Sequence, residues 1–341
     1  MEEHKKYIRR CLELAQLGLG SAAPNPLVGS VIVYKKRIIG EGYHKLYGTE
    51  HAEVNAVNSV LENNKKYLPD STIYVNMEPC CIYGNTPPCT DLIIKTKIPK
   101  VVIANIDKDE RVSGAGVQKL EKDGIQVTCG VLESEAKEIN RRFFTYFEKQ
   151  RPYIILKWAE TKDGFIAKND SKQHWISNPI SKYYSHKWRT EESAILVGSN
   201  TVLIDDPTLT ARKWSGKNPL RVGTDNQGKF PKNLKIFDDS AKTVIYSIKK
   251  IDHPKYLPIE NESNSLKYIL RDLHSKKVQS LIVEGGAKLL NAFVSKNYWD
   301  EARVFTGNTF FKNGIKAPSL EIAPISTSQI QDNQLSIYRN L

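Results

Sequence analysis

The sequence of 341 residues has few cysteines and lacks any long hydrophobic run. No apolar stretch approaches the roughly 20 residues of a membrane-spanning helix. The residues after Met1 carry charges of both signs, and the apolar segment of a secretory signal does not follow them. The five cysteines are odd in number, and three of them crowd into residues 80–89, which argues against a disulfide framework. We therefore expect a cytoplasmic protein with reduced thiols and no membrane contact.

The composition is that of an ordinary globular protein, with 40% hydrophobic and 26% charged residues. The length predicts two domains. The net charge is +12, and most of the excess falls after residue 150. Such a basic half is compatible with a nucleic-acid partner, a phosphorylated ligand or a lysine-rich surface, and charge alone does not choose among them.

The order of periodic segments predicts two α/β domains. Helices are expected over 8–19, 51–61, 88–95, 114–122, 134–147 and 178–190, and strands over 28–34, 37–40, 72–76, 101–106, 126–128, 153–159, 194–197, 220–224, 243–247, 281–284 and 302–306. The strands at 28–34 and 37–40 are expected to form a hairpin around Lys35-Lys36, and the alternation along the rest of the chain predicts a largely parallel sheet. The polar stretch 247–265 is expected to be a surface loop. Gln150-Arg151-Pro152 marks a boundary between domains 1–147 and 151–341.

A set of metal-binding residue types lies in the first half. His51 and Glu53 open a predicted helix, Cys80 follows a predicted strand, and Cys89 comes after eight intervening residues. Three protein ligands plus a water are typical of catalytic zinc. Glu53, two residues from the histidine, is then placed to move protons for that water. Zinc nucleobase deaminases have this arrangement of residues, in which the glutamate transfers protons and is not a zinc ligand.

The alternative is a structural zinc ribbon, or a helix that contains His and Glu by chance. A ribbon normally offers four ligands, often as C-x2-C pairs. Only three ligands are well placed here, since Cys81 adjoins Cys80 and cannot share one metal with it at good geometry. We interpret Cys81 as a bystander, and Cys11 and Cys129 as core residues.

The second half has three segments suited to phosphate, although it has no G-x-G-x-x-G loop. They are residues 173–177, residues 189–212, and the Gly285-Gly286 turn after a predicted strand. A glycine turn before a helix exposes backbone N–H groups that suit a pyrophosphate. Arg189 and Arg212 suit a phosphate monoester. A plain strand-to-helix turn and an ordinary loop remain the alternatives.

Several motifs together resemble one enzyme family. They are Asn25-Pro26-x-Val28-Gly29, Gly42-Tyr43-His44, His51-Ala52-Glu53, and the run from Pro79-Cys80 to Thr86-Pro87-Pro88-Cys89. The long spacing of the cysteines looks like that of the bifunctional deaminase/reductases of riboflavin biosynthesis. The resemblance implies an α/β fold, with a cytidine-deaminase-like three-layer domain followed by a domain similar to dihydrofolate reductase. It also implies Zn²⁺ and NADPH as cofactors, and a homo-oligomer.

The resemblance assigns roles residue by residue. It implies zinc ligands at His51, Cys80 and Cys89, a catalytic Glu53, and deaminase substrate contacts at Asn25 and His44. In the reductase domain it implies substrate contacts at Lys157, Ser177, Arg189, Leu209, Arg212 and Glu284. It implies NADPH contacts at Ala159, Thr161, Trp175, Gly198, Thr201, Asp205, Gly285 and Gly286. The implied substrate is a small molecule, a diaminopyrimidine carrying a ribosylamino 5-phosphate.

The loop between the cysteines departs from the family pattern. Cys81, Ile82 and Asn85 stand where the family usually has serine, histidine and a basic residue, and Ala115 replaces another basic residue. A second hypothesis is therefore a deaminase of another nucleobase with a repurposed reductase domain. A third is a nucleic-acid binder that uses the basic half, but no aromatic-interleaved basic stripe supports it, and we expect no nucleic-acid partner.

Overall fold

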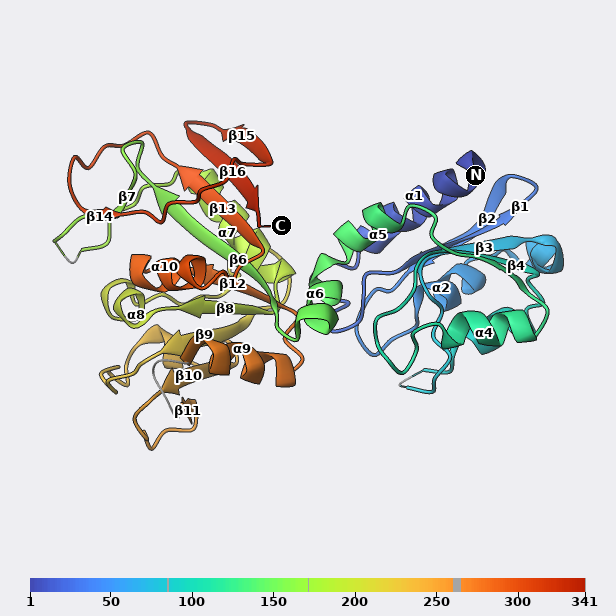
Figure 1. Ribbon diagram of the computed structural model, residues 1–341, viewed down its shortest axis with the longest axis horizontal. Helices are drawn as coiled ribbons and strands as arrows, with labels where there is room; N and C mark the ends of the chain where they lie inside the picture. Colours follow the sequence, from blue (N-terminus) through green and yellow to red (C-terminus); the bar gives the residue numbers. More distant parts are fainter. Residues whose placement is uncertain (85, 171, 260–264, 341) are drawn as a thin grey trace. The chain divides into compact units, whose positions relative to one another are not determined.

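The computed structural model describes residues 1–84, 86–170, 172–259 and 265–340. The chain divides into two compact units, Met1–Lys149 and Gln150–Leu341 (Figure 1). Within the described residues, no helix combines the length and the apolar character needed to cross a membrane.

The first unit is a sheet with helices on both faces. In chain order it contains α1 (Glu2–Gln16), β1 (Gly29–Tyr34), β2 (Arg37–Tyr43), α2 (Ala52–Asn58), the 3-10 helix η1 (Glu62–Asp70), β3 (Thr72–Met77), α3 (Cys89–Lys95), β4 (Lys100–Asn105), α4 (Ala115–Lys122), β5 (Gln126–Thr128), α5 (Glu133–Ile139) and α6 (Arg141–Lys149). The described strands follow the order β2-β1-β3-β4-β5. Helices α2, α3 and α4 pack on one face, and α1 and α5 on the other.

Only part of this sheet is parallel. β3, β4 and β5 run parallel, but β1 pairs antiparallel with both β2 and β3. The β1–β2 pair is the hairpin that the sequence predicts, whereas the antiparallel pairing of β1 with β3 departs from the expectation of a largely parallel sheet. Gly42 lies in β2 so close to α2 that a Cβ atom would meet the Ala56 nitrogen at 2.5 Å. This close approach fixes the distance between α2 and the sheet.

Two further expectations for this unit are wrong. The single helix expected over 134–147 is two helices, α5 and α6, separated at Asn140. The Asn140 side chain bonds the backbone of Leu27, accepting from its N–H at 2.7 Å and donating to its carbonyl at 2.9 Å. The Asn140 side chain therefore hydrogen-bonds a segment that is distant in the sequence, at the position where the helix is interrupted. Cys129 is exposed, whereas Cys11 is buried as expected.

The second unit is built around a larger sheet. It contains β6 (Tyr153–Glu160), β7 (Phe165–Ala167), α7 (Pro179–Glu191), β8 (Ala194–Val197), α8 (Ser199–Asp205), β9 (Leu220–Thr224), the 3-10 helix η2 (Lys235–Phe237), β10 (Thr243–Ser247), β11 (Tyr256–Pro258), α9 (Ser265–Ser275), β12 (Ser280–Glu284), α10 (Ala287–Ser295), β13 (Glu301–Thr306), β14 (Ile315–Lys316), β15 (Ser326–Ile330) and β16 (Asn333–Arg339). The described strands form one nine-stranded sheet, β11-β10-β9-β8-β12-β6-β13-β16-β15, and the pair β14-β7.

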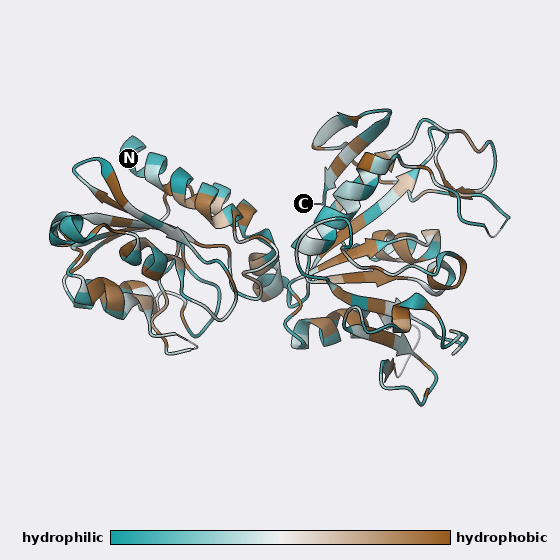
Figure 2. Cartoon of the chain, turned by 180° about the vertical axis from the view of Figure 1, so that it is seen from behind, coloured by the Kyte–Doolittle hydropathy of each residue, from teal (hydrophilic) through white to brown (hydrophobic). Residues whose placement is uncertain are grey.

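The large sheet is parallel except where β16 pairs with β13 and β15. Its central strands are hydrophobic, as Figure 2 shows, and apolar clusters cover both faces. The carboxyl ends of β6, β8 and β12 meet at one edge of the sheet. The residues that follow these strands are therefore brought together, as expected for a ligand site in an open α/β sheet.

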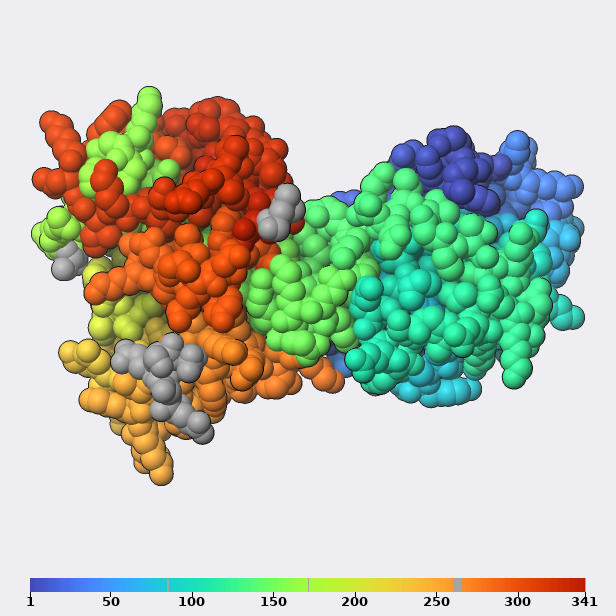
Figure 3. Space-filling model, viewed as in Figure 1, coloured from blue at the N-terminus to red at the C-terminus, as the bar shows by residue number. Residues whose placement is uncertain are grey.

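Several elements of this unit differ from the expectations. β11 lies inside the stretch 247–265 that was expected to be a loop, of which residues 260–264 lie outside the described part. The strands β7, β14, β15 and β16 and the helices α8 and α9 were not predicted. Residues 326–329 of β15 are exposed and polar, so no apolar alternation marks them as a strand. Figure 3 shows the C-terminal segment, in red, at the surface of this unit.

Candidate functional site

The first candidate site lies where α2, α3 and the end of β3 meet. His51 is the residue before α2, Cys80 lies three residues after β3, and Cys89 begins α3 after Pro88. The His51 Nδ1 atom is 3.4 Å from the Sγ atom of Cys80 and 3.4 Å from that of Cys89. The three potential ligand atoms all lie within 4.8 Å of one another.

These distances fit a zinc ion. Zn–S bonds of about 2.3 Å and Zn–N bonds of about 2.0–2.1 Å at a tetrahedral angle place nitrogen and sulfur about 3.6 Å apart. Both observed nitrogen–sulfur distances are close to this value. Two thiols and one imidazole are also the soft donor set that zinc prefers. The residues present therefore suit the metal, with one coordination position left for a water.

The two thiols have different proton affinities. Hydrogen bonding from Cys89, and then from His51, lowers the pKa of the Cys80 thiol to about 4 despite its burial. The pKa of Cys89 is raised well above the usual value, first by its hydrogen bond to Cys80 and then by burial. A bound metal takes both sulfurs as thiolates.

Glu53 is a buried carboxylate beside these groups. It lies in the first turn of α2 and is 3% exposed. Burial raises the pKa of Glu53 to about 7, and the negative charge on Cys80 adds to this effect, whereas His51 opposes it. A carboxyl group with a pKa near neutrality both accepts and releases protons readily at physiological pH.

His44 and Asn25 form one wall of this site. The Nε2 atom of His44 lies 3.0 Å from the Nδ2 atom of Asn25, and its Nδ1 atom lies 3.0 Å from the Glu50 carbonyl oxygen. The His44 and His51 rings meet edge to face at 5.3 Å. Burial lowers the pKa of His44, which keeps its imidazole neutral and able to accept a hydrogen bond.

Two buried asparagines hold the segment that carries Asn25, and sequence reasoning missed both. Asn76 donates to the Leu27 carbonyl at 2.9 Å and accepts from the Gly29 N–H at 2.7 Å. Asn140 bonds both backbone groups of Leu27. Their only signal in the sequence is a polar residue within or beside an apolar segment.

The altered loop lies at the rim of this site. Cys81 and Ile82 are half-buried, and Tyr83 is 78% exposed, with its hydroxyl 3.3 Å from the Asp91 carboxylate. Asp91 also forms an ion pair with Lys119 of α4. Asn85 lies outside the described residues. Ala115 starts α4, after Gly114 in the left-handed conformation.

The second candidate site contains a buried ion pair at the carboxyl end of the large sheet. Lys157 of β6 stands beside Glu284 of β12 in the strand register. Arg189 of α7 donates to Glu284 through Nη2 at 2.7 Å, and both side chains are 12% exposed. Burial alone raises the pKa of Glu284, but the charges of Arg189 and Lys157 outweigh it and lower the pKa to about 2. Burial lowers the pKa of Lys157.

His186 belongs to the same cluster, and sequence reasoning missed it. It lies one helical turn before Arg189 on α7 and is 5% exposed. Burial, followed by the charges of Arg189 and Arg212, lowers the pKa of His186 to about 4. The Thr210 carbonyl accepts from Arg189 at 3.1 Å. The segment 209–212, which includes the buried Leu209, therefore lies against this cluster.

A second group of predicted residues meets at the glycine turn after β12. Gly285 and Gly286 have φ values of 80° and 70°, in the left-handed region, and precede α10. A Cβ atom on Gly285 would lie 3.1 Å from the Thr201 side chain, so α8 packs directly on this turn. Gly198 begins α8 and lies near Leu289 of α10. Close backbone approach and free helix-terminal N–H groups suit a pyrophosphate.

The remaining predicted residues have other placements. Thr161 is fully buried and bonds Asp163 at 2.6 Å and the Phe165 N–H at 3.0 Å, so it stabilises the turn after β6. Trp175 is 64% exposed, with the Lys182 ammonium 3.3 Å from its ring centre. Ala159 of β6 and Ser177, which lies before α7, are both half-buried. Asp205 ends α8 and lies beside Gln173.

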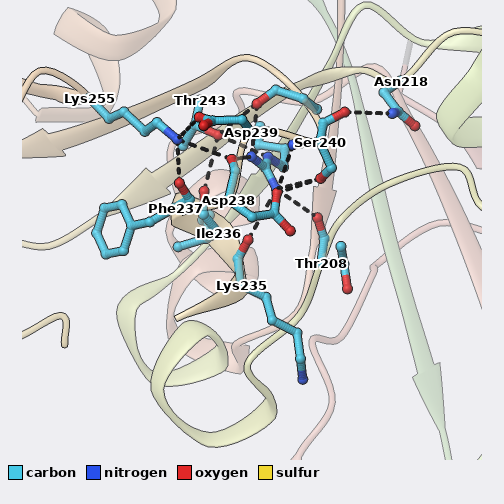
Figure 4. A network of polar contacts seen from close by, with 12 residues as sticks. Thr208, Asn218, Lys235, Ile236, Phe237, Asp238, Asp239, Ser240, Thr243 and Lys255 are labelled. Atoms are coloured by element: carbon cyan, nitrogen blue, oxygen red, sulfur yellow. Dashed lines mark hydrogen bonds and ion pairs between the residues drawn. The ribbon is translucent and has the colours of Figure 1, made fainter. Parts of the chain in front are cut away.

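A buried arginine organises the loop that carries Leu209. Arg221 of β9 is fully buried. Its guanidinium donates to Asp238 Oδ1 at 2.7 Å, to Thr243 Oγ1 at 2.8 Å, and to backbone carbonyls of Thr208, Lys235, Asp238 and Ala241. Figure 4 shows Thr208 and the turn at residues 235–240 converging on this point. Thr208 precedes Leu209, so Arg221 fixes the start of that loop.

Comparison with known proteins agrees with this geometry. Residues 1–105 match the family described as cytidine and deoxycytidylate deaminase zinc-binding region, and residues 152–311 match the RibD C-terminal domain. The riboflavin biosynthesis protein RibD of Aquifex aeolicus is 38% identical over 96% of this chain and 93% of its own length. The chain belongs to the RibD family. The RibD of Bacillus amyloliquefaciens is 35% identical over 94% of this chain and 88% of its own length.

Solved RibD structures have the same fold over the whole chain. One is a diaminohydroxyphosphoribosylaminopyrimidine deaminase/5-amino-6-(5-phosphoribosylamino)uracil reductase from Thermotoga maritima, with a TM-score of 0.90 and 35% identity, covering 100% of this chain and 99% of that one. Acinetobacter baumannii RibD has a TM-score of 0.90 and 29% identity, covering 98% of each chain. The chain is thus a bifunctional riboflavin-pathway enzyme, a zinc-dependent deaminase and an NADPH-dependent reductase acting on a small molecule.

Proposed function

We propose that residues 1–147 deaminate a diaminopyrimidine bearing a ribosylamino 5-phosphate, and that residues 151–341 then reduce its ribose to a ribityl chain. The observation that carries the first step is the meeting of His51, Cys80 and Cys89 beside the buried Glu53. The names of the RibD relatives support the substrate. Free thiols at all five cysteines support a cytoplasmic location.

In the deaminase unit, His51, Cys80 and Cys89 would hold a zinc ion, which would supply a nucleophilic water at neutral pH. Glu53 would hold and move a proton between the attacking water and the exocyclic amine, which would leave as ammonia. Its raised pKa suits both transfers. Asn25 and the neutral His44 hold the pyrimidine by hydrogen bonds, since they share one wall of the site.

In the reductase unit, the substrate phosphate binds near Arg189 and Arg212, with Ser177, Leu209 and Glu284 around it. When bound, NADPH would supply hydride to the sugar carbon that bears nitrogen. We propose that the turn at Gly285-Gly286, with Gly198 and Thr201, holds the pyrophosphate, and that Ala159, Thr161, Trp175 and Asp205 complete the cofactor site. Lys157, which stands beside Glu284 in the strand register, would also contact the substrate.

Mass spectrometry of the reaction tests this assignment. The purified enzyme is given the diaminopyrimidine ribosylamino phosphate with and without NADPH. We expect loss of ammonia in both cases and a further gain of two hydrogens only with NADPH. Reduction of pre-deaminated substrate without any deamination would contradict the first assignment. Light scattering tests the accompanying proposal of a homo-oligomer, and no change of mobility with RNA or DNA is expected.

The loop after Cys80 favours one alternative, a deaminase of a different base. Ile82 is half-buried and offers no hydrogen bond at the rim where the family usually has histidine. Loss of one buried polar contact costs about 1–3 kcal/mol of binding. Turnover of cytosine, guanine or deoxycytidylate, faster than that of the pathway substrate, would support this alternative.

A further inference from the structure

Glu78 is a buried carboxylate that the proposed reaction does not use. It follows β3, is 4% exposed, and is separated from Cys80 only by Pro79. Its Oε2 atom accepts from the N–H groups of Asp107 at 3.1 Å and Gly114 at 2.9 Å. Its Oε1 atom accepts from the N–H groups of Gly116 at 2.9 Å and Val117 at 3.2 Å. Each oxygen therefore accepts two hydrogen bonds.

Most of these donors belong to the start of α4. The first N–H groups of a helix have no partner within the helix, and the positive end of the helix dipole favours a negative charge there. Glu78 satisfies these groups from the neighbouring chain segment. Its own N–H donates to the Asn105 carbonyl at 2.9 Å. The carboxylate thus ties β3, β4 and α4 together at one point.

The peptide that leads to Cys80 is also packed tightly. A Cβ atom on Gly116 would lie 2.3 Å from the Pro79 carbonyl oxygen, so the backbone of α4 touches that peptide. On the other side, the Cys80 carbonyl accepts from the Thr90 N–H at 3.2 Å and the Thr90 hydroxyl at 3.3 Å. Cys80 is therefore held from α4 through Glu78 and Pro79, and from α3 through Thr90.

We propose that Glu78 is a positioning residue that fixes the Cys80 sulfur at the place the metal requires, by anchoring the Glu78-Pro79-Cys80 segment to the start of α4. This inference rests on the proposed zinc site. Glu78→Gln tests it, because an amide of the same size keeps one acceptor oxygen and turns its NH₂ group toward backbone N–H donors. We expect two of the four hydrogen bonds to be lost and the segment to shift.

The experiment measures metal binding by the full chain, not turnover. Apoprotein is prepared with a chelator, zinc affinity is measured by competition with a chromophoric chelator, and the Co²⁺ form is examined by visible absorption. For Glu78→Gln we expect a zinc affinity about 10–100-fold weaker and an altered cobalt d–d spectrum. Glu121→Gln, on the exposed side of α4, is the matched control and should match the wild type in both readouts.

A second variant covers the case in which Glu78→Gln fails to fold. Gly116→Ala leaves the carboxylate intact but presses on the Pro79 carbonyl, and we expect the same weakening of zinc binding. Wild-type zinc affinity and cobalt spectrum in either folded variant would overturn the positioning role, even if the variant unfolds more easily. Failure of the zinc site itself is distinguishable, because wild-type protein would then bind no zinc and its cobalt form would lack thiolate charge-transfer absorption.

Discussion

Replacing Arg221 by methionine should destabilise the reductase unit far more than the deaminase unit. The guanidinium is fully buried and donates to four backbone carbonyls, the Asp238 carboxylate and the hydroxyls of Thr243 and Ser240. Methionine fills a similar volume but offers no donor. Each buried acceptor left without its donor costs about 1–3 kcal/mol, so the loss of these bonds together costs at least about 3 kcal/mol. At about 1.4 kcal/mol per tenfold, the unfolded fraction of the unit rises at least a hundredfold.

The two activities of the chain provide the assay. Reductase and deaminase rates are measured on the same Arg221→Met sample after equilibration in increasing urea. We expect the reductase midpoint to fall while the deaminase midpoint stays near that of the wild type. The KM of the reductase should also rise, since the Thr208 carbonyl loses its donor next to Leu209. Lys242→Met, at an exposed neighbouring position, is the control. An unchanged reductase midpoint, or equal loss of both activities, would refute this reasoning.

Three further predictions concern the sites themselves. Glu53→Gln should retain one zinc per chain by metal analysis but lower the deamination rate about 10²–10⁴-fold, with reduction unaffected; loss of the metal would contradict a purely proton-moving role. For Glu284, folding lowers the pKa from the usual 4.5 to about 2, so its stabilisation is complete above pH 4.5 and is lost as the pH falls toward 2. Denaturation of wild type and Glu284→Gln across that window should show the difference shrinking; a constant difference contradicts the ion pair with Arg189. Asn140→Ala leaves the Leu27 N–H without its acceptor. It should lower the free energy of unfolding of the first unit by about 1–3 kcal/mol and raise the deaminase KM. Unchanged values of both would show that water replaces the amide.

The parts of the fold that sequence reasoning predicted are those with a strong local pattern. β6, β8 and β12 are continuous apolar runs, and such runs identify buried parallel strands. The zinc-binding residue types were recognisable because histidine, cysteine and their spacing carry the chemistry directly. Membership of the RibD family confirms the fold class and the pair of activities. The individual roles of the reductase residues stay predictions.

The parts that sequence reasoning missed depend on contacts between distant segments. The break at Asn140 arises from a bond to Leu27, 113 residues away, which no local pattern encodes. β15 is polar and exposed, so it forms a strand only because β16 lies beside it. The pKa of His186 is lowered first by burial and then by the charges of Arg189 on the same helix and of Arg212, which three-dimensional packing brings close. Tertiary contacts, not intrinsic preference, determine each of these features.

The loop between Cys80 and Cys89 is fixed at its ends and open in its middle. Glu78 and Thr90 secure the two ends, whereas Tyr83 is 78% exposed and a Cβ atom on Gly84 would meet no described atom within 4 Å. Random mutagenesis confined to residues 81–86 should therefore yield many folded, metal-loaded variants. Evolution has the same freedom here, so the bases accepted by relatives of this enzyme can diversify without rebuilding the centre that performs the chemistry.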